Sequence, residues 1–219
     1  MEEQPHSVTA ESHPVLKSAA ALGLVAVLGA GLLAAVDWLT ADRIAEQERR
    51  VVLQQLGQIV PASRYDNALQ DDRFSFRAES WFPRGQEVVA WRARRDGQPV
   101  AVILKFSAVD GYNGDIGLLT GINADGTLAG VRVTAHNETP GLGDAIERDK
   151  SDWILGFDGK SLGNPPAKDW AVRRDGGQFD QFTGATITPR AVVSAVRRAL
   201  EYFEGHRKQL FDTPAAPLE

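Results

Sequence analysis

The chain has 219 residues, which is enough for one folded domain with additional segments but not for two large domains. Its net charge of −5 and pI of about 5.4 argue against a nucleic-acid binder, which usually presents a basic face. The lack of cysteine excludes disulfides, iron–sulfur clusters, cysteine-ligated zinc and a cysteine nucleophile. The four histidines, His6, His13, His136 and His206, are not at metal-ligand spacing, so we expect no metal site. A redox role would therefore require an organic cofactor.

An uncharged apolar segment runs from Ser18 to Val36, between Lys17 and Asp37. As a helix it would span roughly 28 Å, close to the hydrocarbon thickness of a bilayer. Its length and the acidic tail before it are unlike a cleaved signal peptide. We therefore predict a transmembrane helix over residues 18–38, after an N-terminal tail of residues 1–17.

The basic residues around this segment favour a cytoplasmic location for the large domain. One lysine precedes the segment, whereas Arg43, Arg49 and Arg50 follow it, and positive charge usually marks the cytoplasmic side.

Residues 39–80 are predicted to form a stalk and a linker. The pattern from Asp37 to Gln58 is helical, and Pro61 ends it. No element is predicted over residues 61–80.

Two β-hairpins are predicted next. Asp96-Gly97 and Asp125-Gly126 are typical of tight turns between antiparallel strands. The predicted strands span Glu87–Arg94, Pro99–Phe106, Asp115–Ile122 and Thr127–Ala135, with a further strand near Gln178–Phe182 and a short helix over Asp144–Leu155.

The clearest helix follows Thr188, which can act as its N-cap, with Pro189 at its first position. Gly205 is predicted to end this helix, and residues 206–219 are predicted to be a flexible C-terminal tail. The apolar face of the helix comprises Val192, Val193, Val196, Leu200 and Phe203.

The first candidate motif, Asp180–Thr188, leads from a turn into the N-terminus of this helix. Free N–H groups and the positive end of the helix dipole favour phosphate there, and Gly184 and Ala185 allow a phosphate to approach the backbone. One threonine hydroxyl can carry an esterified phosphate; the alternative is a capping turn without a ligand. The threonines are Thr183, Thr186 and Thr188.

Two further segments carry candidate ligand-binding groups. The sequence HNETPGLG, His136–Gly143, offers imidazole, carboxylate and hydroxyl groups for a polar ring edge, or is an ordinary connection. It lacks the third glycine of the dinucleotide-binding fingerprint. In Asp110–Ile116, two glycines flank Tyr112, which suits either a wall for a planar ligand or a β-turn.

In this order, behind one apolar span, the three segments resemble the FMN-binding G subunit of the Rnf electron-transport complex. They are also similar to its close relative, the C subunit of the sodium-translocating NADH:quinone oxidoreductase. The stretch Asp180-x-x-Thr183-Gly184-Ala185-Thr186 matches the flavinylation signature of the family, D-x-x-[ST]-G-A-T. The resemblance covers roughly residues 15–205.

The resemblance implies that a flavin transferase esterifies the phosphate of FMN to Thr186. We expect the FMN-binding domain, residues 81–205, to have an α+β fold with a mainly antiparallel sheet and packed helices. The flavinylation motif then comprises Asp180, Thr183, Gly184 and Ala185, the cofactor-binding residues are Glu138, Thr139, Leu142, Gly143 and Tyr112, and Thr188 caps the helix near the phosphate.

The resemblance also implies an electron carrier, not catalytic alone, in a complex that couples NADH–ferredoxin electron transfer to ion translocation. Its partners are then the other subunits, the flavin transferase and the bacterial inner membrane, with no nucleic acid. The resemblance implies that the folded domain is on the periplasmic side, whereas the arginines after the apolar segment favour the cytoplasm. We follow the resemblance, because the motif match is more specific than three arginines. The alternatives are the related quinone-oxidoreductase protein, another membrane flavoprotein, or a cofactor-free membrane-anchored assembly module.

Overall fold

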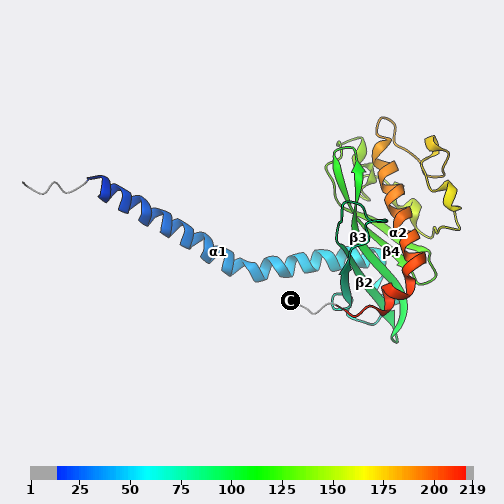
Figure 1. The fold of residues 1–219 in the computed structure, drawn as a ribbon, viewed down its shortest axis with the longest axis horizontal. Helices are drawn as coiled ribbons and strands as arrows, with labels where there is room; N and C mark the ends of the chain where they lie inside the picture. Colours follow the sequence, from blue (N-terminus) through cyan, green and yellow to red (C-terminus); the bar gives the residue numbers. More distant parts are fainter. Residues whose placement is uncertain (1–13, 216–219) are drawn as a thin grey trace, which may run out of the picture. The chain divides into compact units, whose positions relative to one another are not determined.

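A computed structural model describes the backbone of residues 14–215 (Figure 1). It describes the side chains of residues 18–19, 21–34, 50 and 52–215. The chain divides into two compact units, residues 1–50 and residues 51–219, and the second holds the sheet and the candidate site.

The helix α1 extends from Pro14 to Ile59 and includes both the predicted span and the predicted stalk helix. Among the described residues, no helix has the combination of length and apolar character that crossing a bilayer requires. Residues 1–13 of the predicted tail, and the side chains of residues 35–38 of the predicted span, lie outside the described residues.

Five antiparallel strands form one sheet in sequence order, β1-β2-β3-β4-β5. The predicted turn between β2 and β3 is present, with positive φ angles of 50° at Asp96 and 73° at Gly97, as a tight hairpin requires. The four predicted strands and the α+β class are therefore confirmed. The strands span Arg73–Phe76 (β1), Val88–Arg95 (β2), Gln98–Gly111 (β3), Gly114–Asn123 (β4) and Leu128–Ala135 (β5).

The helix α2, Ile187–Asp212, covers one face of this sheet and packs mainly on β3 (Figure 1). Side chains alternate between the two faces of a strand, so Val102 and Leu104 join the core under α2. Val192, Val196 and Phe203 of α2 are fully buried in that core.

The last turns of α1 contribute to a second, smaller core on the opposite face. Leu56 and Ile59 pack there with Trp91 of β2 and Ile103 of β3. Gly121 of β4 leaves room for this contact, because a Cβ atom there would lie 2.2 Å from Cγ2 of Ile59. Both faces of the sheet are thus covered.

Three elements differ from the predictions. The strand β1 lies in the segment for which none was predicted. The predicted helix over Asp144–Leu155 is replaced by two short 3₁₀ helices, because Ser151 bonds to the backbone at Ala145 and Trp153 and competes with helical pairing. Residues 178–182 form isolated pairings instead of a strand, and Phe179 packs on Phe157 and Trp170.

Contrary to the prediction, α2 does not end at Gly205. The backbone departs from helical geometry at His206 and then continues as a helix to Asp212, with Leu210 and Phe211 buried. Residues 206–212 are therefore part of the fold and not of a flexible tail, whereas residues 216–219 lie outside the described residues.

Two arginines of β2 hold the end of α2. The buried guanidinium of Arg92 donates to the carbonyl oxygens of Phe211 and Thr213, and Arg94 donates to that of Phe211. Both arginines also donate to the carboxylate of Asp72, at 2.7 and 2.8 Å. These bonds satisfy helix-terminal carbonyls that would otherwise lack a partner.

The contact between Gly121 and Ile59 predicts a non-additive pair of substitutions. Gly121→Ala should lower the free energy of unfolding of the full-length protein by about 1–3 kcal/mol, because the added methyl group overpacks the smaller core. Ile59→Ala removes the Cγ2 atom that the new methyl group would meet. The double variant should therefore lose less unfolding free energy than the sum of the two single losses. Urea unfolding of all four proteins measures this difference, and strict additivity would contradict the contact.

Candidate functional site

The turn before α2 has an unusual geometry at its helix N-terminus. Phe182 pairs with Ala185 across Gly184, whose φ of 81° lies in the left-handed region that favours glycine. Helix α2 begins at Ile187, and Thr186 is its N-cap residue, yet the Thr186 hydroxyl forms no capping hydrogen bond. Such a hydroxyl remains available for another partner.

The three threonines of the turn have different environments. Thr183 is exposed, and Thr186 is half-buried. Thr188, the predicted N-cap, is 1% exposed, and its hydroxyl donates to Oε2 of Glu138. The prediction that Thr188 caps α2 is therefore wrong, because this residue lies inside the first turn and its hydroxyl is engaged by a residue of another segment.

The HNETPGLG segment connects β5 to the first of the short 3₁₀ helices. The N–H groups of Leu142 and Gly143 donate to the carbonyl oxygen of Thr139, at 3.1 and 3.0 Å, and close the loop. Nδ1 of His136 accepts from the backbone N–H of Glu138, and Nε2 lies 2.9 Å from Oε1 of Glu147. His136 thus supports the loop and does not face the side chain of Glu138.

The third segment, Gly111–Gly114, is the tight turn between β3 and β4. The backbone N–H of Asn113 donates to Oε1 of Glu138 at 2.9 Å, and that of Tyr112 donates to Oε2 at 3.3 Å. A side chain at Gly111 would meet the carbonyl oxygen of Gly114 at 2.2 Å and Oε1 of Glu138 at 3.0 Å. Glycine is therefore required for this close approach.

Glu138 joins the three segments. Its side chain is 4% exposed and accepts hydrogen bonds from the β3–β4 turn and from the first turn of α2. Gly143 permits this packing, because a Cβ atom there would lie 2.9 Å from both Cβ of Glu138 and Oγ1 of Thr188.

A cavity of about 300 Å³ lies where the segments meet. Its rim is apolar, because Tyr112, Leu142 and Ile187 are exposed there, at 64%, 43% and 42%. Ile187 is the lining residue that the sequence analysis did not select. Its position directly after Thr186 could have indicated it. The cavity is lined by Tyr112, Glu138, Thr139, Leu142, Gly143, Gly184, Ala185, Thr186, Ile187 and Thr188.

Two residues of the segment that resembles the flavinylation signature, Asp180 and Thr183, are not among the lining residues. The carboxylate of Asp180 forms an exposed ion pair with Arg173 at 2.9 Å, and its carbonyl oxygen accepts from the indole of Trp153. An exposed ion pair contributes little to stability, so the fold itself gives no reason for an aspartate here.

An ion pair supports the start of α2 from outside. Arg190 donates two hydrogen bonds to the carboxylate of Asp175, at 2.6 and 2.9 Å. The hydrogen bonds from Arg190 hold the pKa of Asp175 below its usual value. This pair ties the preceding 3₁₀ helix, Arg173–Asp175, to the first turn of α2.

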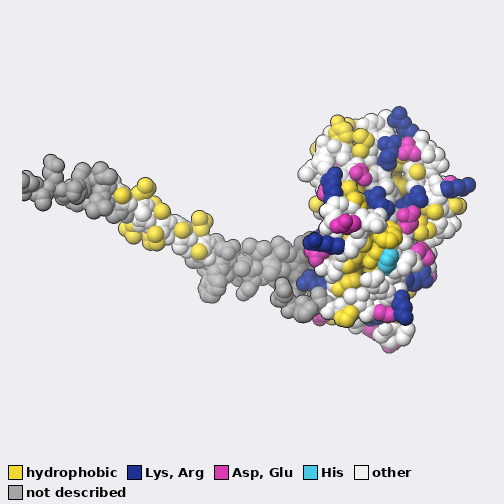
Figure 2. Space-filling model, viewed as in Figure 1, with side chains coloured by type: hydrophobic (Ala, Val, Ile, Leu, Met, Phe, Trp, Pro, Cys, Tyr) yellow, Lys and Arg dark blue, Asp and Glu magenta, His cyan; other side chains and the backbone are white. Residues whose placement is uncertain are grey.

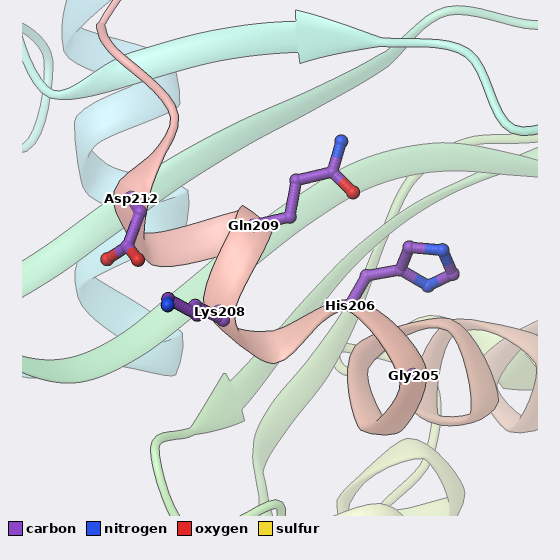
Figure 3. A pocket seen from close by; sticks show the side chains of 5 residues that line it. All are labelled: Gly205, His206, Lys208, Gln209 and Asp212. Atoms are coloured by element: carbon purple, nitrogen blue, oxygen red, sulfur yellow. The ribbon is translucent and has the colours of Figure 1, made fainter.

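Other surfaces offer less specific chemistry. Figure 2 shows acidic and basic side chains intermingled on the face that it draws. In the hollow of Figure 3, at the break in α2, His206 and Gln209 extend away from Lys208 and Asp212. No group of three or more metal-ligating side chains occurs within residues 52–215 or the other described side chains.

Comparison with known proteins matches the sequence around this cavity to a protein family. The model of the FMN-binding domain matches residues 111–201, which include every residue that lines the cavity, and the model of the RnfG N-terminal region matches residues 9–59. The G subunit of the ion-translocating oxidoreductase complex from Pseudomonas aeruginosa is 51% identical over 90% of this chain and 92% of its own length. The G subunits from Vibrio cholerae and Shewanella loihica are each 45% identical, over 91% and 92% of this chain and 95% of their own lengths.

The chain belongs to the family of G subunits of the ion-translocating oxidoreductase complex. The resemblance drawn from the sequence motifs is therefore confirmed, and the protein has an FMN-binding domain. The residues of the cavity fit FMN: a helix N-terminus with a left-handed glycine suits the phosphate, and the apolar rim suits a planar ring.

The packing around Gly143 predicts a loss of stability in a glycine variant. Gly143→Ala should lower the free energy of unfolding by about 1–3 kcal/mol, because its methyl group meets the buried side chains of Glu138 and Thr188. Gly156→Ala is the matched control, because no atom lies within 4 Å of an added Cβ there. Urea unfolding of the two full-length variants measures their free energies of unfolding. Equal values would contradict the close packing of Gly143 against Glu138 and Thr188.

Proposed function

We propose that this protein carries electrons within a membrane-bound Rnf-type complex, using one FMN esterified through its phosphate to Thr186. The observation that carries the proposal is an N-cap hydroxyl without a capping bond, at the edge of a cavity inside the FMN-binding domain. The complex couples electron transfer between NADH and ferredoxin to ion translocation, and this chain alone is not catalytic.

Among the three threonines, accessibility and orientation favour Thr186 as the acceptor. Thr188 is buried and already donates its proton to Glu138, and Thr183 is exposed but does not line the cavity. Thr186 alone of the three both lines the cavity and is partly accessible to solvent. A phosphate attached there lies beside the first N–H groups of α2, which have no helical partner.

Maturation requires a flavin transferase with FAD as the donor. The hydroxyl oxygen of Thr186 bonds to the phosphorus of the FMN half of FAD, the pyrophosphate bond breaks, and AMP leaves while the hydroxyl loses its proton. The exposed Asp180 and Thr183, outside the cavity, are proposed to form part of the surface that the transferase recognises.

Covalent attachment suits an electron relay because the cofactor never dissociates. FMN supplies the ability to exchange one or two electrons. Leu142, Ile187 and Tyr112 would hold the ring, and the polar and small-residue wall of the cavity comprises Thr139, Gly143, Gly184 and Ala185.

We further propose that residues 18–38 span the inner membrane, with the FMN-binding domain, residues 81–205, on the periplasmic side. The segment from Ser18 to Val36 has no charged side chain, so it offers no pathway for ions by itself. Translocation then belongs to the assembly, in which the other subunits are the partners. Residues 1–17 are the tail before the span, and residues 39–80 form the stalk and linker.

Intact mass of the full-length protein, co-expressed with a flavin transferase, tests the attachment. The wild type and Thr186→Ser should gain the mass of one FMN less one water, because both keep a hydroxyl. Thr186→Val should gain nothing and lose the flavin fluorescence of its band on a denaturing gel.

Fragmentation of the tryptic peptide Asp175–Arg190 locates the modified residue among its three threonines. Undiminished flavin on Thr186→Val would refute the acceptor assignment. A wild type without any flavin, after co-expression, would favour a cofactor-free assembly module. Co-purifying proteins distinguish the Rnf complex from the sodium-translocating quinone oxidoreductase.

A further inference from the structure

Glu138 is a buried acidic residue that has no cationic partner among the described side chains. Its carboxylate accepts hydrogen bonds from two backbone N–H groups and one hydroxyl, all of them neutral donors. Among the described residues, no lysine or arginine forms an ion pair with it. Burying a charge that only neutral groups satisfy is costly, so its presence in the cavity wall points to a use for the charge.

The neighbouring acids are in different environments. Asp144, also buried, lies 3.8 Å from Nζ of Lys150, whereas the side chain of Glu147 is partly exposed to solvent and bonds to Nε2 of His136. Neither of these carboxylates lines the cavity. Among the residues that line the cavity, Glu138 is the acidic one, and no lysine or arginine is among them.

We propose that the Glu138 carboxylate lowers the reduction potential of the flavin held in this cavity, an inference that rests on the proposed function. Reduction places additional negative charge on the flavin ring. A fixed negative charge in a poorly solvated wall opposes that change, because Coulomb interactions are weakly screened there. The hydrogen bonds from Tyr112, Asn113 and Thr188 hold the charge in place.

The midpoint potential of the flavin in the full-length, flavin-loaded protein tests the proposal by spectroelectrochemical titration at one pH. Glu138→Gln should shift the potential to more positive values, because the amide has the shape of the carboxylate but no charge. Glu147→Gln is the matched control and should leave the potential unchanged. A Glu138→Gln potential equal to or below that of the wild type would overturn the proposal.

Thr188→Val distinguishes the effect of the charge from that of a disrupted cavity. This variant removes the hydroxyl that donates to Glu138 but keeps the carboxylate, so one dipole fewer screens its negative charge. The potential should therefore shift to more negative values, opposite to Glu138→Gln. If disruption of the pocket were the cause, both variants would shift in the same direction.

The Thr188→Val measurement also decides the matter if Glu138→Gln fails to fold, since an unchanged or more positive potential would overturn the proposal. The failure of this inference is distinct from failure of the proposed function. Wild-type protein without flavin contradicts the function, whereas flavin-loaded variants with unshifted potentials contradict only the role of the charge.

Discussion

The candidate site depends on the hydrogen bonds that one buried carboxylate accepts. Glu138 follows the edge strand β5, yet its partners come from the β3–β4 turn and from α2. Pairing of Gly117 with Ala135 brings the end of β5 towards the β3–β4 turn, but the sheet alone does not place the start of α2 there. The carboxylate satisfies their donors at one point, and the glycines at 111 and 143 allow the chain to approach it.

This junction also explains how the helix N-terminus is presented. Because Glu138 engages Thr188, the first turn of α2 is fixed from its buried side, and Thr186 is left at the cavity with an unused hydroxyl. The ion pair between Arg190 and Asp175 supports the same turn from its exposed side. A rigid helix start is a suitable place for a covalently held group, because attachment then requires no rearrangement of the backbone.

Local signals predicted much of this fold, and distant contacts account for the rest. The turns at Asp96-Gly97 and Asp125-Gly126 identified the hairpins, whereas β1 carries no comparable signal. Gly205 is a normal helix stop, but the end of α2 is stabilised by Arg92, which is more than a hundred residues earlier in the chain.

The site shows the same division. Motif resemblance brought together most of the residues that line the cavity, because glycine and threonine spacing is a local property. The role of Thr188 was mistaken, since a threonine before a proline is typical of a helix cap and its true partner lies 50 residues away. Ile187 was missed because an aliphatic side chain carries no chemical signature.

Amide hydrogen exchange at Tyr112 and Asn113 tests most directly whether Glu138 holds the site together. The side chain of Tyr112 is exposed, and these residues form a hairpin tip, where unprotected amides exchange rapidly. Because both N–H groups donate to the buried carboxylate, we expect protection well above that of Gly97 at the β2–β3 hairpin tip. Exchange at Tyr112 and Asn113 as fast as at Gly97 would contradict the role of Glu138.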